Sequence, residues 1–132
     1  MEERPSIGCA VLVEHEGRFL LGERNKKNYN GYWVIPGGRV KFGEGLKQAG
    51  IREIKEETGL DVDIVGFIGH KEIINTPDNY HRIVFFYLGK PRTLELSASD
   101  DISKAGFFAI DEIKKMKTAE SVVWALRKAG FW

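Results

Sequence analysis

Apolar and polar residues alternate in blocks along the first third of the chain, and these blocks predict short strands. Residues 6–13 form a nearly continuous apolar run with β-branched members, and residues 18–22 form a second run after a polar turn at 14–17. Two such runs separated by a short polar segment are typical of a β-hairpin. Residues 32–35 predict another short strand, which Pro36 ends. The loop expected next contains Gly37, Gly38, Gly43 and Gly45.

The middle of the chain changes to a helical pattern and then returns to strands. Residues 46–58 contain no proline, and Gly59 stands where the left-handed end of a helix favours glycine, so we expect a helix there. Residues 62–74 and 80–88 are rich in β-formers, and residues 75–79 between them suit a turn. These two stretches should therefore pair as antiparallel strands.

The last third of the chain predicts one more strand and one more helix. A polar linker at 97–103 precedes a short apolar strand at 106–109. Residues 118–129 form the second helix, whose inward-facing residues are Val122, Val123 and Leu126. Strands before, between and after two helices indicate an α/β protein, with a mixed β-sheet between helices in an α/β/α sandwich. The length of 132 residues is near the usual size of one domain, so we expect a single domain over 1–132.

The charge balance and the single cysteine narrow the classes of protein. The chain has 20 Lys and Arg against 19 Asp and Glu, and this net charge of +1 excludes the strongly basic surface of sequence-independent nucleic-acid binding. Cys9 alone cannot form an intramolecular disulfide, which favours a reducing compartment. The start carries acidic residues where an export signal needs cations, and no apolar run approaches the ~18 residues of a membrane span. We therefore expect a cytoplasmic protein without a membrane or nucleic-acid partner.

Three carboxylates share one face of the first predicted helix. At about 100° per residue, Glu53, Glu56 and Glu57 fall within an arc of about 100°. Glu53 and Glu57 form a like-charged i, i+4 pair that costs an isolated helix about 0.2–0.5 kcal/mol, so a cation should compensate it. A solvated acidic surface is the simpler interpretation. Glu44 in the preceding glycine loop favours a metal site instead, because carboxylate and carbonyl oxygens from a loop and a helix suit Mg²⁺.

The spacing of these residues resembles the signature of a known family. Gly38, five residues, Glu44, seven residues and then the run REIKEETGL at 52–60 match the signature of the Nudix hydrolases at every fixed position. The predicted order of strands and helices also looks like the Nudix α/β/α sandwich. The resemblance implies hydrolysis of a nucleoside diphosphate linked to another moiety, with Mg²⁺, or alternatively Mn²⁺, as the cofactor.

The resemblance also implies roles for residues of the motif. The implied metal ligands are the carbonyl of Gly37 and the carboxylates of Glu53, Glu56 and Glu57. Residues that orient these ligands are Gly38, Glu44 and Arg52, of which Arg52 is counted as catalytic with Glu53 and Glu57. Attack of water on phosphorus needs a base, and Glu53 is the first choice. Because the identity of the base varies within the family, the alternatives are Glu57, Glu95, Asp100 and Asp101.

The candidates for contact with the substrate are Arg24, Tyr32, Arg39, His81 and Arg82. The guanidinium groups of Arg24 and Arg39 could bind phosphate oxygens with two hydrogen bonds each. Tyr32 could stack on a nucleobase, as could Tyr29, whereas Trp33 is expected in the core. His81 and Arg82 begin a strand and could face the cleft.

The substrate and the reaction stay open within the family. Pro77, seventeen residues after Leu60, resembles a marker of the ADP-ribose branch. Residues 23–25 and 31–39 resemble the GDP-mannose branch, whose late histidine base has no counterpart after His81. A third branch hydrolyses nucleoside triphosphates. The alternatives to a pyrophosphohydrolase are a GDP-mannose-type glycosyl hydrolase and a nucleotide-sensing module without turnover. Homodimers are common in the family, so a homodimer is a candidate state.

Overall fold

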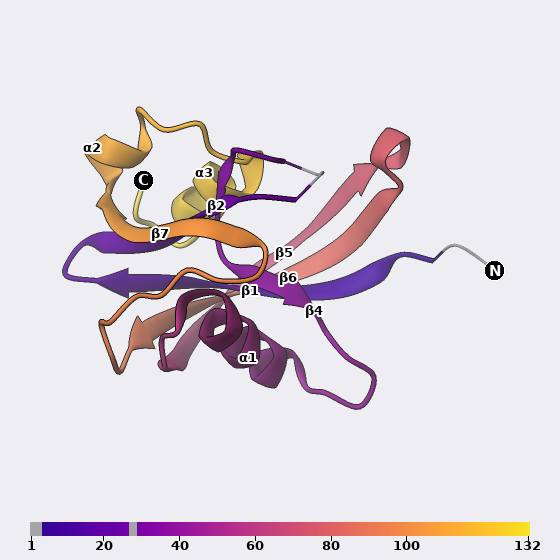
Figure 1. Cartoon of the computed structure of the whole chain (residues 1–132), viewed down its shortest axis with the longest axis horizontal. Coiled ribbons are helices and arrows are strands. Elements are labelled where there is room, and N and C mark those ends of the chain that lie inside the picture. Colours follow the sequence, from indigo (N-terminus) through magenta and orange to yellow (C-terminus); the bar gives the residue numbers. More distant parts are fainter. Residues whose placement is uncertain (1–3, 27–28) are drawn as a thin grey trace.

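The computed structural model of the protein describes residues 4–26 and 29–132 and shows strands interspersed with helices (Figure 1). The strands are β1 Ser6–His15, β2 Arg18–Arg24, β3 Trp33–Val34, β4 Gly37–Arg39, β5 Val62–Asn75, β6 Tyr80–Pro91 and β7 Ile102–Ala109. The helices are α1 Leu46–Thr58, α2 Ile110–Ile113 and α3 Glu120–Lys128, with one 3₁₀ turn, η1, at Thr76–Asp78. The predicted helix at 46–58 is confirmed at both ends.

The strands form a mixed sheet that lies between helices, as predicted. The main order is β3-β2-β1-β6-β5, with β4 paired to β1 and β7 paired to β2. Strands β1 and β6 run parallel, whereas β1–β2 and β5–β6 are antiparallel. Figure 1 shows α1 on one face of the sheet and α2 and α3 on the other. No helix in residues 4–26 and 29–132 is long and apolar enough to cross a membrane.

Strand β1 divides the core into two layers. Because side chains alternate between the two faces of a strand, neighbouring residues of β1 face opposite helices. Leu12 packs in a cluster with Leu126 of α3, whereas Val11 packs with Ile54 of α1. All four side chains are fully buried. The central strand therefore fixes the position of both helical layers.

Glycines set where α1 ends and how closely it approaches the sheet. Gly59 ends the helix with φ of 79°, a left-handed conformation that glycine adopts without a steric penalty, and its N–H donates to the carbonyl of Lys55. At Gly50, a Cβ atom would lie 2.8 Å from Cγ2 of Val11 and 2.9 Å from Sγ of Cys9. Only glycine lets the helix backbone pack this closely on β1.

The glycine loop and the end of the chain differ from the prediction. Residues 37–39, expected in a loop, form β4, because Gly38 pairs with Cys9 and Gly37 with Ala10 of β1. A short glycine-rich strand has no hydrophobic pattern, so only this tertiary pairing defines it. The last strand begins at Ile102 rather than at 106, and α2 was not expected. Val123, predicted to face inward, is half-buried.

Candidate active site

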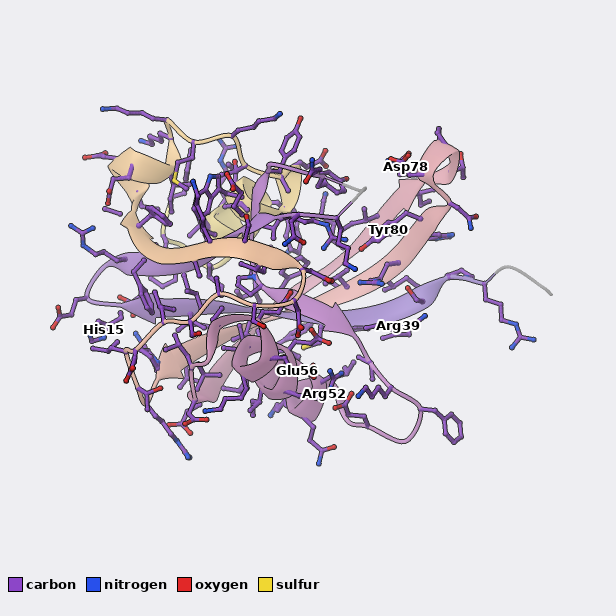
Figure 2. The ribbon with its side chains drawn as sticks, viewed as in Figure 1. His15, Arg39, Arg52, Glu56, Asp78 and Tyr80 are labelled. Carbon is purple, nitrogen blue, oxygen red and sulfur yellow. The ribbon has the colours of Figure 1, made fainter. Side chains whose placement is uncertain are left out.

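Helix α1 brings its three glutamates to one open site beside β4. A surface cavity there is lined by Glu53, Glu56 and Glu57 from α1, by Asn25 and Lys26 after β2, and by Asp100 and Asp101 before β7. We call this set the acidic site. Figure 2 shows Arg52 and Glu56 together on α1, whereas His15 lies far away at the tip of the β1–β2 hairpin. Segments distant in sequence thus supply the charges of one site.

Arg52 is the centre of a network of carboxylates that includes Glu53 and Glu56 of the acidic site. Its Nε and Nη2 donate to the two carboxylate oxygens of Glu44 at 2.7 and 3.0 Å. Its Nη1 donates to Oε1 of Glu53 at 2.8 Å and to Oε1 of Glu56 at 2.7 Å, and Nη2 also donates to the carbonyl of Arg39. The bonds from Arg52 and from the Lys41 N–H lower the pKa of Glu44 to about 2. Glu44 therefore stays charged and holds the guanidinium in place.

Glu57 is a buried carboxylate with little to compensate its charge. Its side chain is 2% exposed, and Oε1 accepts a hydrogen bond from the Gly37 N–H at 3.0 Å. Burial, with the nearby charges of Glu53 and Asp101, raises the pKa of Glu57 to about 8, against the opposing effects of Gly37 and Arg24. Burial likewise raises the pKa of Glu53, although Arg52 opposes it. The site would therefore be stabilised by an added cation.

The donor atoms of the acidic site are oxygens, the type of ligand that suits a divalent cation such as Mg²⁺ or Mn²⁺. As positioned, no three His, Cys, Asp or Glu side chains in the described part of the chain converge closely enough to hold a metal ion. Glu53 and Glu56 instead turn toward Nη1 of Arg52, while Glu57 accepts from Gly37. Oxygen donors are nevertheless what Mg²⁺ and Mn²⁺ prefer, and the absence of a side chain at Gly38 makes room for the Glu53 carboxylate. These three glutamates are the residues that would hold the ion.

We expect the metal-free protein to lose thermal stability as pH rises from 4.5 toward 8. The folded-state pKa of Glu57, about 8, exceeds its ordinary value of 4.5, so the folded chain binds more protons than the unfolded chain in this interval. The contribution of Glu57 to stability is therefore fully present below 4.5, falls between 4.5 and 8 while only the unfolded chain ionises this carboxyl, and levels off above 8. Calorimetric melting in EDTA should show this fall, with a flatter profile for Glu57→Gln. Mg²⁺ should restore stability at pH 8 in the unaltered chain, and identical profiles for the two proteins would contradict the assignment.

A second cavity, of about 230 Å³, adjoins the acidic site and shares Glu57 with it. Of the residues predicted to contact substrate, Arg24 and Arg82 line this cavity, together with Tyr29. Residues 71–74 of β5 and the start of α3 close its other sides. Glu57 therefore borders both the acidic site and any ligand that binds in the second cavity.

Three of the residues predicted to contact substrate, His81, Tyr32 and Arg39, do not line the second cavity. His81 is not among the residues that line the cavity, because it alternates with Arg82 along β6, and it contacts Glu72 at 3.1 Å. Tyr32 lies edge-on to Tyr29 and beneath the ammonium of Lys117, outside the lining.

Arg39 is exposed at the end of β4, and its carbonyl accepts a hydrogen bond from Nη2 of Arg52 (Figure 2). Trp33 packs edge-on against Phe108 at the border of the core, at 5.1 Å between ring centroids.

The candidate bases separate into two groups in space. Asp100 and Asp101 lie in the acidic site with Glu53 and Glu57, whereas Glu95 is exposed and outside its lining. Lys26 contacts Asp101 at 3.2 Å, and the side-chain amide of Asn25 donates to the carbonyl of Asp100. The loop that carries the two aspartates is thus fastened to the end of β2.

Sequence reasoning missed several residues of the second cavity. Tyr80, Lys71 and Glu120 all line it. The period of two along a strand could have identified Tyr80, which faces the same side of β6 as Arg82. Lys71 and Glu120 come from β5 and α3 and meet only in the folded chain, where they form an ion pair at 3.1 Å. No sequence signal joins them.

Comparison with known proteins gives matches to a family model and to individual relatives. A model of the NUDIX domain matches residues 2–126. An ADP-ribose pyrophosphatase from Methanocaldococcus jannaschii is 31% identical over 115 residues, 85% of this chain and 66% of that protein. An oxidized purine nucleoside triphosphate hydrolase from Danio rerio is 33% identical over 127 residues, 86% of this chain and 73% of that protein.

Solved structures give the same result for the fold. The crystal structure of a MutT NUDIX hydrolase from Burkholderia pseudomallei has a TM-score of 0.87 and 26% identity, and the match covers 96% of this chain and 98% of that one. Some relatives are much longer than this chain, which spans just 66% of the first relative and 17% and 22% of two others.

Proposed function

This chain belongs to the Nudix family, and we propose that it hydrolyses the pyrophosphate linkage of a nucleoside diphosphate derivative with the aid of Mg²⁺ or Mn²⁺. The single observation that carries the proposal is the position of Glu57, a buried carboxylate that lines both the acidic site and the adjoining cavity. We further propose that residues 1–132 act as one domain in this reaction.

The residues of the acidic site, together with Arg52 and Glu44, have separate roles in hydrolysis. A divalent cation held by Glu53, Glu56 and Glu57 would neutralise phosphate oxygens and lower the pKa of a nearby water. Arg52 orients Glu53 and Glu56 through its Nη1, and Glu44 holds Arg52. Without a cation between them, the acidic helix face would repel the phosphate that water attacks. The protein's own contribution is therefore to keep these carboxylates in one fixed arrangement.

We assign the base to Glu53. Its carboxylate is half-buried at the acidic site, and burial raises its pKa above the ordinary value, which makes the ionised carboxylate a stronger base. Glu57, Asp100 and Asp101 are the alternatives at the same site, whereas Glu95 lies outside it. Arg24, which lines the adjoining cavity, is placed to bind phosphate oxygens.

The proposed substrates are nucleotide sugars of the ADP-ribose type, with nucleoside triphosphates as the second class. The first is favoured by the relative described as an ADP-ribose pyrophosphatase, and the second by the relative described as a triphosphate hydrolase. Both share a nucleoside joined to a chain of phosphates. Cleavage by water of the linkage between the α and β phosphates gives a nucleoside monophosphate in either case.

A product assay by mass spectrometry tests the proposal. We expect release of a nucleoside monophosphate from ADP-ribose, GDP-mannose or a nucleoside triphosphate in Mg²⁺ or Mn²⁺, and none in EDTA. In water labelled with ¹⁸O, one product phosphate should gain the label, because attack occurs at phosphorus. Release of free mannose with intact GDP would show glycosyl hydrolysis instead. Nucleotide binding without turnover of any substrate would show a sensor, and either result would overturn the proposal.

A further inference from the structure

The guanidinium of Arg82 is held in place from three sides. Its Nε donates to Oγ of Ser6 at 2.9 Å, and its Cζ lies over the ring of Tyr80 at 5.1 Å from the centroid. Its aliphatic stem occupies the space above Gly8, where a Cβ atom would lie 2.7 Å from Cδ of Arg82. A side chain fixed in this way loses little conformational entropy when it binds a ligand.

The binding capacity of Arg82 is largely unused. Within residues 4–26 and 29–132, the guanidinium makes one hydrogen bond, through Nε, and Nη1 and Nη2 make no hydrogen bond or ion pair. Arg82 lines the cavity of about 230 Å³ that adjoins the acidic site. A rigid fork of N–H donors at the wall of a cavity matches a phosphate or carboxylate group, which accepts two parallel hydrogen bonds.

The location of Arg82 favours a phosphate of the substrate over the nucleobase. Gly8, beneath the stem of Arg82, pairs with Arg39 of β4, and the carbonyl of Gly38 lies 3.3 Å from the same Cβ position. Gly38 in turn borders the carboxylate of Glu53. Gly8 and Gly38 therefore lie between the Arg82 stem and the Glu53 carboxylate of the acidic site. The phosphates must lie at this site for hydrolysis to occur. Arg24 lines the same cavity and adds a second positive charge.

We propose that Arg82 binds oxygens of the substrate's diphosphate and that Ser6, Gly8 and Tyr80 are positioning residues that hold its guanidinium ready. The inference rests on the proposed function because it assumes a diphosphate substrate. It adds a phosphate contact on β6, which pairs with β1, the strand that also pairs with β4. The diphosphate would then be held between the carboxylate-bound cation on one side and Arg82 on the other.

Binding of ADP and adenosine, measured by calorimetry in EDTA, tests the proposal. Arg82→Gln should lower the affinity for ADP about 10- to 100-fold, the usual effect of losing charge-assisted hydrogen bonds, and leave the affinity for adenosine unchanged. Arg92→Gln is the matched control, because Arg92 is exposed and paired with Asp63. An equal loss for both ligands, no loss for either, or no binding of ADP to the unaltered protein would overturn the proposal.

Gly8→Ala tests the positioning role without changing Arg82. The new methyl group would displace the Arg82 stem, so the ratio of ADP to adenosine affinity should fall as it does in Arg82→Gln. An unchanged ratio would show that the position of the stem does not matter. Ser6→Ala, which removes one hydrogen bond, should lower the ratio less. These measurements need no metal and no turnover, so they can fail while hydrolysis is observed, or succeed while hydrolysis is absent.

Discussion

Glu57→Gln is expected to lower kcat by about 10³-fold at saturating Mg²⁺, which corresponds to about 4 kcal/mol of transition-state stabilisation. Glutamine keeps the size of the side chain and removes its negative charge. The carboxylate is buried, lines both the acidic site and the adjoining cavity, and has no cationic partner at hydrogen-bond distance in the described residues. A neutral amide oxygen holds a divalent cation much more weakly than a carboxylate does. The measurement is steady-state kinetics on whichever substrate the product assay identifies.

Glu16→Gln is the matched control for Glu57→Gln. Glu16 lies in the β1–β2 turn, with its side chain 82% exposed and far from the acidic site. This variant should retain the full kcat. A Glu57→Gln protein that melts normally and keeps kcat within threefold of the unaltered chain would contradict the assigned role. The melting curve distinguishes loss of activity from loss of fold.

Replacing either of two adjacent glycines with alanine should have different effects: Gly37→Ala should lower stability, and Gly38→Ala should lower activity. At Gly37, the Cβ atom would overlap the carbonyl oxygen of Cys9 and lie 2.6 Å from Cα of Ala10, both parts of the β1 backbone. The backbone cannot move without breaking the sheet, so Gly37→Ala should lose about 1–3 kcal/mol and melt about 5–15 °C lower. At Gly38, the Cβ atom would lie 2.5 Å from both carboxylate oxygens of Glu53, the mobile end of a side chain.

Gly38→Ala should therefore fold normally and lose activity. Displacing the Glu53 carboxylate removes a ligand and the assigned base together, so we expect kcat to fall about 100-fold with a melting temperature within about 2 °C of the unaltered chain. Gly66→Ala is the control for both variants, because its Cβ would meet nothing closer than 3.9 Å. Full activity in Gly38→Ala, or normal melting in Gly37→Ala, would contradict the geometry at that position.

The elements predicted correctly are those whose signals are local. Helix α1 could be bounded at both ends because the capping glycine at 59 and the run without proline lie within the segment itself. The same local order placed Glu53, Glu56 and Glu57 on one face, since side chains of one helix keep fixed angles to each other. Strand β4 could not be predicted, because its identity as a strand depends on pairing with β1.

The second cavity shows why part of the site escaped prediction. Ser6 and Arg82 are 76 residues apart and meet only because β1 and β6 run parallel. Hydrophobic periodicity does not specify which strands become neighbours. His81 and Arg82 were equally good candidates in the sequence, and the pleat of β6 separates them, with Arg82 at the cavity and His81 away from it. The roles of all these residues remain proposals that the variants above address.

The parallel pairing of β1 with β6 also governs when the protein can first function during its synthesis. Strand β1 is synthesised well before its partner β6, which ends at Pro91, so the central sheet cannot close until residue 91 has been made. Contacts between such distant segments slow folding and leave apolar edges exposed in the meantime. A nascent chain that stops before β6 has helix α1 with all its glutamates but lacks a wall of the ligand cavity. Substrate binding therefore awaits synthesis of β6 and of the start of α3, which also lines the cavity.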